Sequence, residues 1–341
     1  MPTMWGVHND QPQLDLVDNG FISIGWDEMG DLSALGNDKD AMKAKVAATY
    51  PDSKPGAIPG TAGTLLSFVY RMHVGDFVVY PHKPDSTLNF GQIDGEYTYD
   101  PALPLHRNRR RVTWLKTGVP RTTFSEPARF EVGAAMTIFQ VKKHLQEFLD
   151  YIAGTPTIIT PRVAVDPDEA EEVATDAVSA GRIEDDTRDF IVATLMRELE
   201  GADFERFVAH LLQQIGYRTR VTQVSGDGGV DIIAHKDPLG LEPPIIKVQC
   251  KRTTSSMGGP IVQNLVGTLS PGGSELGLFV TLGSFSKDAL HIERTRQDLR
   301  LINGKELVDL VFAHYDTFSP EYKRMLPMRS VYVVDRGLNA A

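Results

Sequence analysis

The sequence predicts two domains: a β-rich N-terminal domain of α+β type, and a C-terminal α/β domain with a mixed sheet flanked by helices. Three observations predict this architecture. The chain has 341 residues, more than one domain of ordinary size contains. Short apolar runs separated by Gly, Pro, Asp and Asn fill the first part, whereas strand-like and helix-like segments alternate in the last part. A strongly acidic stretch separates the two parts.

The acidic stretch is the predicted linker. Residues 151–200 contain 12 acidic and 4 basic side chains, while the whole chain has a net charge of −10. The segment DPDEAEEVATDAVSAGRIEDD (166–186) lacks aromatic residues, which is typical of a solvated, partly helical connector. The alternative is a surface helix of one large domain. We predict domains over residues 1–155 and 188–341, joined by an acidic linker over 156–187.

Composition excludes several classes of protein. Lys and Arg total 35 against 45 for Asp and Glu, so a wholly basic DNA-coating protein is excluded, although a local basic groove is not. Cys250 is the single cysteine, which excludes an intramolecular disulfide framework and a Cys-rich zinc site. The start of the chain lacks the pattern of a signal peptide, and no apolar run approaches the roughly 18 residues of a membrane span. We expect a soluble, cytoplasmic protein with no membrane partner.

The first domain is expected to be a small barrel or a strongly bent sheet. Helical spacing of apolar residues predicts helices over 61–73 and 135–152. Four apolar runs bounded by turn residues predict strands: FISIGW (21–26), VGDFVVYP (74–81), LNFGQIDGEYTYD (88–100) and RRRVTWLKTG (109–118).

Aromatic residues of this domain are candidates for a base pocket. Rings with a polar tip suit stacking on a base taken out of the helix, and the candidates are Trp26, Tyr97, Tyr99 and Trp114. The alternative is that most of these rings belong to the core.

A run of arginines provides a second functional feature. Arg109, Arg110 and Arg111 follow one another along a predicted strand, so they cannot all face a core. Some must face solvent or phosphate, and we take all three as DNA-binding candidates. The alternative is a solvated strand edge.

The order of phrases in this region carries a family resemblance. WGVHND, SIGWDEMGDLSAL, VGDFVVYP, FGQIDGEYTYDP and HRNRRRVTWL occur in succession over residues 3–150. This resembles the PUA-like or EVE-like module that is fused to Mrr-type restriction nucleases. The resemblance implies a barrel that binds nucleic acid and can hold a modified base.

The second domain is expected to alternate helices and strands. Its first helix is centred on residues 204–212, with Asp203 as N-cap and Gly216 at its end. An Asn-Gly turn and a closing helix are predicted within 299–315. The remaining predicted elements are strands over 217–224, 230–236, 244–253 and 275–283, an SGDGG turn (225–229), and helices within 253–270 and 284–296.

Three residues of this domain predict a hydrolytic site. Gln249 and Lys251 are two apart on one strand, so both face one side, and Cys250 faces the core side. With Asp231 they place an acid, an amide and a cation at one end of the sheet. Such groups suit phosphodiester hydrolysis with Mg²⁺, or with Mn²⁺ as the alternative, because oxygen ligands hold the ion and an ammonium can position the attacking water. Glu205, on the preceding helix, is a candidate second carboxylate, and the alternative is a role only within its helix.

The wider pattern resembles a known catalytic domain. FERFVAHLLQQIGY, VTQVSGDGGVDIIAHK, VQCKRTTSSMGGPIVQNLVGTL and GLFVTLGSFSKDAL, within residues 188–315, resemble the catalytic domain of the Mrr family of restriction endonucleases. The spacing of Asp231, Gln249 and Lys251 resembles the PD-(D/E)xK core. The resemblance implies that these three residues and Glu205 are catalytic. It also implies Asp231, Gln249 and Glu205 as metal ligands, with Gln249 in place of the commoner Glu.

Residues beyond this core are candidates for DNA contacts. Ser255, Ser256 and Gln263 flank or occupy the helix predicted after Gly258, and Lys287 begins the next helix. The alternative for the first three is a simple loop.

We expect a Mg²⁺-dependent endonuclease of restriction type that acts on double-stranded DNA, directed to modified DNA by base flipping in the N-terminal domain. Cutting both strands needs two sites, so a homodimer or a DNA-induced dimer is expected. The alternatives are a structure-specific repair or junction nuclease and a non-cleaving DNA-binding protein with a degenerate site.

Overall fold

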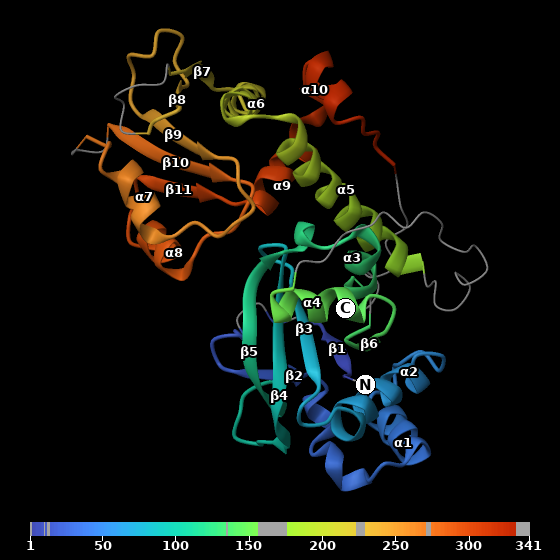
Figure 1. The fold of residues 1–341 in the computed structure, drawn as a ribbon. Coiled ribbons are helices and arrows are strands. Elements are labelled where there is room, and N and C mark those ends of the chain that lie inside the picture. The colour runs from blue at the N-terminus through green and yellow to red at the C-terminus, as the bar shows by residue number, and fades with distance from the viewer. Residues whose placement is uncertain are drawn as a thin grey trace. The chain divides into compact units, whose positions relative to one another are not determined.

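The chain folds into two compact units, Met1–Val173 and Ala174–Ala341. The computed structural model describes residues 2–9, 11, 14–133, 136–155, 176–222, 229–270 and 274–331, with side chains of the helix that begins at Asp176 described from residue 183 onward. The division falls inside the predicted linker, of which residues 156–175 lie outside the described part of the chain. The predicted boundaries at 155 and 188 stay predictions. Figure 1 shows that each unit has a sheet and helices of its own.

The first unit contains a six-stranded sheet with the strand order β2-β5-β4-β3-β1-β6. Strands β1 and β3 run parallel, and the other neighbouring strands run antiparallel. The strands are β1 (Met4–Val7), β2 (Phe21–Ile24), β3 (Phe77–His82), β4 (Thr87–Tyr99), β5 (Asn108–Pro120) and β6 (Ile138–Val141). The predicted PUA-like or EVE-like barrel is not confirmed, because β2 and β6 stand at the two ends of this row and the described residues show no pairing between them.

Helices cover both faces of this sheet. They are α1 (Lys39–Thr49), α2 (Ile58–Leu66), α3 (Glu126–Val132) and α4 (Leu145–Ala153). Neighbouring strand residues enter different cores, since Val78 packs in the cluster that includes α1 and α2, and Val79 in the cluster that includes α3 and α4. The second cluster contains the rings of Phe90, Phe124 and Phe148, whose centroids are 4.9 to 5.6 Å apart.

One predicted helix of this unit is wrong over half its length. The predicted helix over 135–152 begins, in the structure, as strand β6, and α4 starts only at Leu145. Strand β6 pairs antiparallel with β1, which gives its backbone hydrogen-bond partners that a short apolar run cannot reveal from its own sequence.

The second unit contains the predicted mixed sheet, with the strand order β11-β10-β9-β8-β7. Strands β9, β10 and β11 are parallel, whereas β7, β8 and β9 are antiparallel neighbours. The strands are β7 (Arg218–Val221), β8 (Ile232–His235), β9 (Ile245–Lys251), β10 (Glu275–Thr281) and β11 (Leu299–Ile302). Because β8 opposes β9, the start of β8 and the end of β9 lie at one edge of the sheet.

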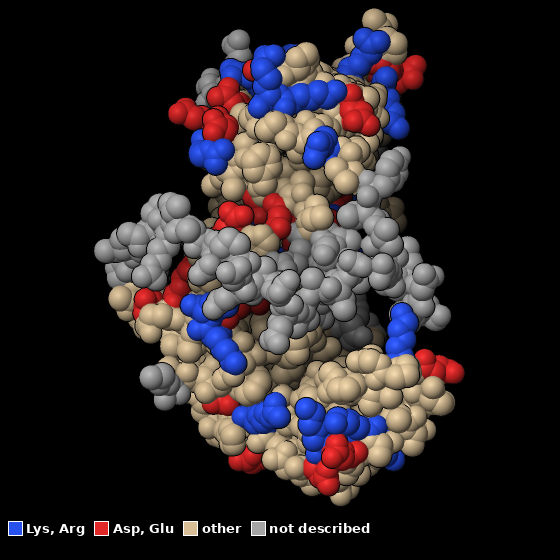
Figure 2. All heavy atoms as spheres, turned by 90° about the vertical axis from the view of Figure 1, so that its right-hand side faces the viewer, with Lys and Arg blue, Asp and Glu red and all other residues tan. Residues whose placement is uncertain are grey.

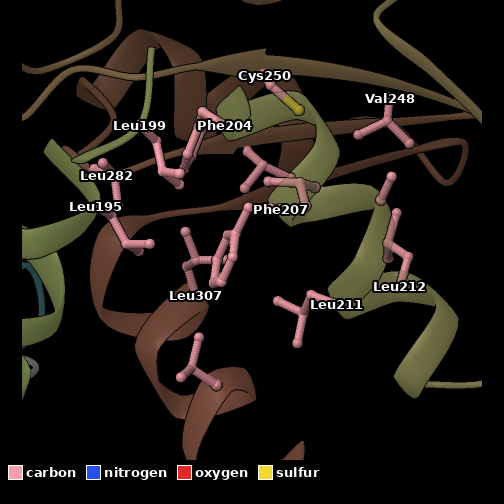
Figure 3. Packing of buried hydrophobic residues seen from close by; sticks show 14 of the residues in the cluster. Leu195, Leu199, Phe204, Phe207, Leu211, Leu212, Val248, Cys250, Leu282 and Leu307 are labelled. Carbon is pink, nitrogen blue, oxygen red and sulfur yellow. The ribbon is translucent and has the colours of Figure 1, made fainter. Parts of the chain in front are cut away.

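Helices pack against this sheet on both faces (Figure 1). They are α5 (Asp176–Glu198), α6 (Gly201–Gln214), α7 (Gly259–Val266), α8 (Lys287–Arg294), α9 (Gly304–His314) and α10 (Pro320–Met325). Side chains of α5, α6 and α9 form one buried cluster with Val248 and Cys250 of β9 (Figure 3). Helices α7 and α8 cover Phe279 of β10 and Leu301 of β11 on the other face. Among the described residues, no helix is both long and apolar enough to cross a bilayer.

The predicted N-cap of the first helix of this unit is wrong. The N-cap of α6 is Glu200, so Asp203 lies within the first turn instead of preceding it. The strand and closing helix predicted within 299–315 are present as β11 and α9, and Asn303 between them caps α9, since its side chain accepts from the Glu306 amide.

Candidate active site

Asp231 is fixed to strand β9 at the edge of the sheet. Its backbone N–H donates to the Val248 carbonyl at 2.8 Å, and its Oδ2 accepts from the Cys250 amide at 2.7 Å. The Asp231 carboxylate therefore meets β9 between Gln249 and Lys251, where the sequence predicts that the three side chains converge.

Successive residues of β9 face opposite sides of the sheet, so the candidate site residues and the core residue Cys250 lie on different faces. Cys250 is 6% exposed and packs in the cluster beneath α6, as Figure 3 shows. Burial raises the pKa of the Cys250 thiol well above its ordinary value, which keeps the thiol protonated and unsuited to nucleophilic attack. Gln249 and Lys251 lie on the opposite face, where Gln249 is 5% exposed and Lys251 is exposed.

Glu205 lies within the electric field of Asp231 and Lys251, because the charges of both residues shift its pKa. Burial raises the pKa of Asp231, opposed by the hydrogen bond from Cys250 and by the charge of Lys251. Burial also raises the pKa of Glu205, and the negative charge of Asp231 raises it further, against the effects of Lys251 and Arg206. Two carboxylates that repel each other beside an ammonium form a site that gains from a bound cation.

The oxygen atoms at this site fit a hard divalent ion. The Oε1 atom of Gln249 is buried and has no hydrogen-bond partner among the described residues. The described chain contains no group of three His, Cys, Asp or Glu side chains that could hold a metal. At this edge of the sheet the candidate ligands are the carboxylates of Asp231 and Glu205 and the amide oxygen of Gln249. Oxygen donors supplemented by water are the ligands that Mg²⁺ takes in proteins, and Mn²⁺ accepts the same donor set.

Gly229 closes against the amide of Gln249. Its φ is +88°, and a Cβ built there would lie 2.8 Å from the Nε2 atom of Gln249. Any larger residue would be strained and would displace the buried amide. The rest of the predicted SGDGG turn, residues 225–228, lies outside the described residues.

Two threonines that the sequence analysis does not single out support the backbone of this site. The Thr222 amide donates to the Asp231 carbonyl at 2.9 Å, which extends the β7–β8 ladder to Asp231. Thr281, opposite Lys251 in the β9–β10 pairing, donates its hydroxyl hydrogen to the Lys251 carbonyl at 3.0 Å. A polar residue at the end of a predicted strand is the signal that could have identified both.

The predicted DNA-contact residues of this unit are exposed. Ser255 and Ser256 lie in the loop after β9, at the same edge as Lys251. That loop is bound to the loop before α8 by an isolated bridge between Met257 and Phe285. The exposed side chain of Lys287 begins α8, and that of Gln263 lies farther along, in the middle of α7.

The arginine run of the first unit divides between two sides of β5. Arg110 is 1% exposed, and its Nε and Nη2 donate to the carbonyls of Phe68 and Val69 at 2.7 Å each. In this structure Arg110 is therefore not accessible to DNA, because it serves the core beside α2. Arg109 is half-buried over the Phe21 ring, while Arg111 is exposed and paired with Asp94 at 2.8 Å.

The predicted base-pocket rings are half-buried. Trp26, Tyr97 and Trp114 pack against the cluster that includes α2. The Tyr97 hydroxyl accepts from the Leu32 amide at 3.0 Å and lies 2.6 Å from Asn108 Oδ1, so its polar tip is already engaged. Trp114 donates to the Leu16 carbonyl at 3.1 Å, and the structure does not place Tyr99 in the buried clusters of the described residues.

Charge on the surface is mixed. Figure 2 shows Lys and Arg in blue interspersed with Asp and Glu in red on the face that it draws, without a single broad basic surface.

Two family models match parts of this chain. Residues 196–311 match the Mrr catalytic domain family, which is described as restriction endonuclease. Residues 5–142 match a family described as a domain of unknown function (DUF8426).

Two curated proteins are similar to parts of this chain. The chain is similar to the type IV methyl-directed restriction enzyme EcoKMrr of Escherichia coli (strain K12), with 30% identity over 134 residues, or 38% of this chain and 43% of that enzyme. It is also similar to an uncharacterised mitochondrial protein of Schizosaccharomyces pombe, with 35% identity over 95 residues, or 27% of this chain and 38% of that protein. The chain thus spans less than half the length of these curated relatives.

Two solved structures show a distant likeness. One is the MspJI restriction endonuclease in complex with a 27-mer oligonucleotide, with 17% identity, a TM-score of 0.34, and coverage of 95% of this chain and 77% of that chain. The other is the DNA modification-dependent restriction endonuclease AspBHI, with 17% identity, a TM-score of 0.31, and coverage of 70% and 64% respectively.

Proposed function

We propose that this protein is a Mg²⁺-dependent endonuclease of the restriction type that hydrolyses phosphodiester bonds in double-stranded DNA. One observation carries the proposal: the Asp231 carboxylate is hydrogen-bonded to β9 between Gln249 and Lys251, and Gln249 has a buried amide oxygen without a partner. The match of residues 196–311 to a restriction-endonuclease family supports it.

Each residue of the site has a distinct task in this proposal. Asp231, Gln249 and Glu205 would hold the ion through their oxygen atoms, and the chemistry supplied by a bound ion would be polarisation of the scissile phosphate and easier ionisation of a water molecule. The exposed Lys251 ammonium orients the attacking water and offsets the negative charge that builds on the phosphate oxygens. The Cys250 amide fixes Asp231 so that its charge is in place before DNA arrives.

We further propose that the first unit reads DNA and holds a modified base out of the stack. The half-buried rings of Trp26, Tyr97 and Trp114 could provide stacking surfaces, and exposed Arg111 with half-buried Arg109 could contact phosphate. EcoKMrr is named as a methyl-directed enzyme, which favours modified DNA as the target for the restriction domain of this chain.

Double-strand cleavage favours a pair of active sites. We propose a homodimer or a DNA-induced dimer, since one site cuts one strand at a time. The proposal follows from the reaction, and a single cut in each duplex would contradict it.

Cleavage of a matched DNA panel tests the function. The protein and Mg²⁺ are incubated with duplexes of one sequence that carry cytosine, methylcytosine, hydroxymethylcytosine or glucosylated cytosine, together with a four-way junction. We expect cleavage of a modified duplex and weaker cleavage of the unmodified duplex. Cleavage confined to the junction would support a repair nuclease instead, and tight binding without any cleavage would support a degenerate site.

The reading role of the first unit has its own test. Trp26→Ala should weaken binding to modified DNA at least about fivefold more than binding to plain DNA, because stacking on one base contributes about 1–3 kcal/mol. Phe130→Ala on α3 is the matched control. Equal weakening of both DNAs by the Trp26 variant would contradict the base-pocket proposal.

A further inference from the structure

We propose that strand β7 carries a phosphate-binding pair, Arg218 and Arg220, which holds the DNA backbone beside the scissile bond. This inference rests on the proposed nuclease function and names residues that position its substrate.

The register of the sheet places both arginines on the face that carries the active site. Arg218 pairs with His235 and Arg220 with Ile233, and Ile233 in turn pairs with Lys247. Residues opposite each other in a ladder share a face, and so do residues two apart along a strand. Arg220 therefore shares a face with Asp231 on β8.

The same alternation continues on β9. Lys247 shares its face with Gln249 and Lys251, each two residues farther along the strand. The two arginines and the three residues of the predicted core thus project from one side of the sheet.

Contacts on the opposite face of β7 confirm this direction independently. Thr219, between the two arginines, donates to the Ala209 carbonyl of α6 at 3.3 Å and accepts from Gln213 at 2.8 Å. Tyr217 and Val221 pack against the core cluster that includes α6. Because Thr219 faces α6, Arg218 and Arg220 face away from it.

Both guanidinium groups are accessible. Arg218 and Arg220 are exposed, and β7 is the end strand of the sheet, whereas α7 and α8 pack over β10 and β11. Neither arginine has an ion-pair or hydrogen-bond partner among the described side chains. Elsewhere in this unit, Arg296 pairs with Asp298 and Arg300 pairs with Glu293.

Spacing favours a polymer of phosphates over a single free anion. Diagonal neighbours across an antiparallel ladder are about 7–8 Å apart, so Arg220 lies one side-chain length from Asp231. Arg218 is farther along the same strand by about 7 Å. Two arginines in line, leading away from a hydrolytic centre, match the backbone of one DNA strand, and guanidinium is the side chain best suited to bind phosphate through two hydrogen bonds.

Salt dependence of DNA binding tests this inference. Binding of a plain duplex is measured in EDTA at several salt concentrations for the wild type, the double variant Arg218→Ala/Arg220→Ala and the double variant Arg218→Lys/Arg220→Lys. The matched control is Arg197→Ala/Arg324→Ala, which removes two exposed arginines from helices α5 and α10.

We expect the slope of log K against log salt to become shallower by about 1.8 in the alanine variant, because each lost phosphate contact accounts for about 0.9. The lysine variant and the control should keep the wild-type slope. An alanine variant with an unchanged slope overturns the inference, and association of that variant into larger species would then assign the arginines to protection of an edge strand.

A parallel measurement separates this inference from the proposed function. Asp231→Asn should reduce the cleavage rate at least about 100-fold without changing the salt slope. If Asp231→Asn cuts DNA at close to the wild-type rate, the proposed site is wrong, whatever the arginine variants do. If Asp231→Asn is inactive and the arginine variant keeps the wild-type slope, only the phosphate-binding pair is wrong.

Discussion

Replacement of Asp231 by Asn should remove the negative charge of this side chain while keeping its hydrogen bond to β9. The side-chain oxygen of Asn can still accept the hydrogen bond from the Cys250 amide that Asp231 receives at 2.7 Å, so the β8–β9 ladder is preserved. What the variant loses is a negative charge that burial disfavours, as the raised pKa of Asp231 indicates. The metal-free variant should therefore melt at or above the temperature of the metal-free wild type.

The magnitude follows from the energetics of ion binding. At an Mg²⁺ concentration ten times its dissociation constant, the ion stabilises the wild type by about 1.4 kcal/mol. For a unit of this size that corresponds to a rise in Tm of roughly 3–6 °C. The Asn variant should show little of this rise. Its cleavage rate should fall at least about 100-fold, since a loss of a few kcal/mol of transition-state stabilisation reduces the rate by that factor.

The assay combines calorimetry with and without Mg²⁺ and single-turnover cleavage of a modified duplex. Asp316→Asn, which changes an exposed carboxylate beyond α9, is the matched control and should behave as the wild type. An Asp231→Asn protein that keeps the Mg²⁺-dependent rise in Tm and cuts within threefold of the wild-type rate would refute the assignment of the site.

Three further results are expected. Gln249→Glu adds a third carboxylate, so the metal-free protein should be less stable and the half-saturating Mg²⁺ concentration in titrations should fall several-fold; no change in either would show that this side chain does not bind the ion. Because the pKa values of Asp231 and Glu205 are raised in the fold, the native state holds more protons than the unfolded state between their ordinary and raised values. Metal-free stability should therefore fall, and cleavage rise, as pH increases through that window, while a flat stability profile in urea unfolding would contradict the pKa directions. Phe207→Ala removes a side chain that is 0% exposed and packs on the ring of Tyr322 at 5.3 Å, and urea unfolding should show a loss of about 3–5 kcal/mol; a loss below 1 kcal/mol would contradict the packing.

The fold of the second unit could be predicted from sequence because its signals are local and repeated. Asp231 precedes an alternating strand, and the alternation through Cys250 assigns Gln249 and Lys251 to one face without knowledge of any neighbour. The mixed sheet followed from strands separated by helices. Strand pairing depends on distant residues, and several neighbouring residues can each serve as a helix cap. Asp203 is therefore predicted as the N-cap of a helix whose N-cap in the structure is Glu200.

The first unit was harder to predict because its residues serve distant neighbours. From sequence alone Arg110 is predicted to be a surface cation. In the structure it donates to the carbonyls of Phe68 and Val69, which lie 42 and 41 residues earlier in the chain. The sequence of β6 is predicted as helix, because only its pairing with β1, which is distant in the chain, makes it a strand. No periodicity within either segment contains that information.

Asp231 is hydrogen-bonded to β9, so the order in which the strands are synthesised bears on when the proposed site can form. Strand β9 is central in its sheet, so the chain must be synthesised through Thr281 before β10 can flank it. In a nascent chain, or in a fragment truncated before that point, β9 with Gln249 and Lys251 would be an edge strand, because β10 would not yet pair with it. The strand that carries two residues of the proposed site thus gains both of its neighbours only after β10 has been synthesised and has paired with it.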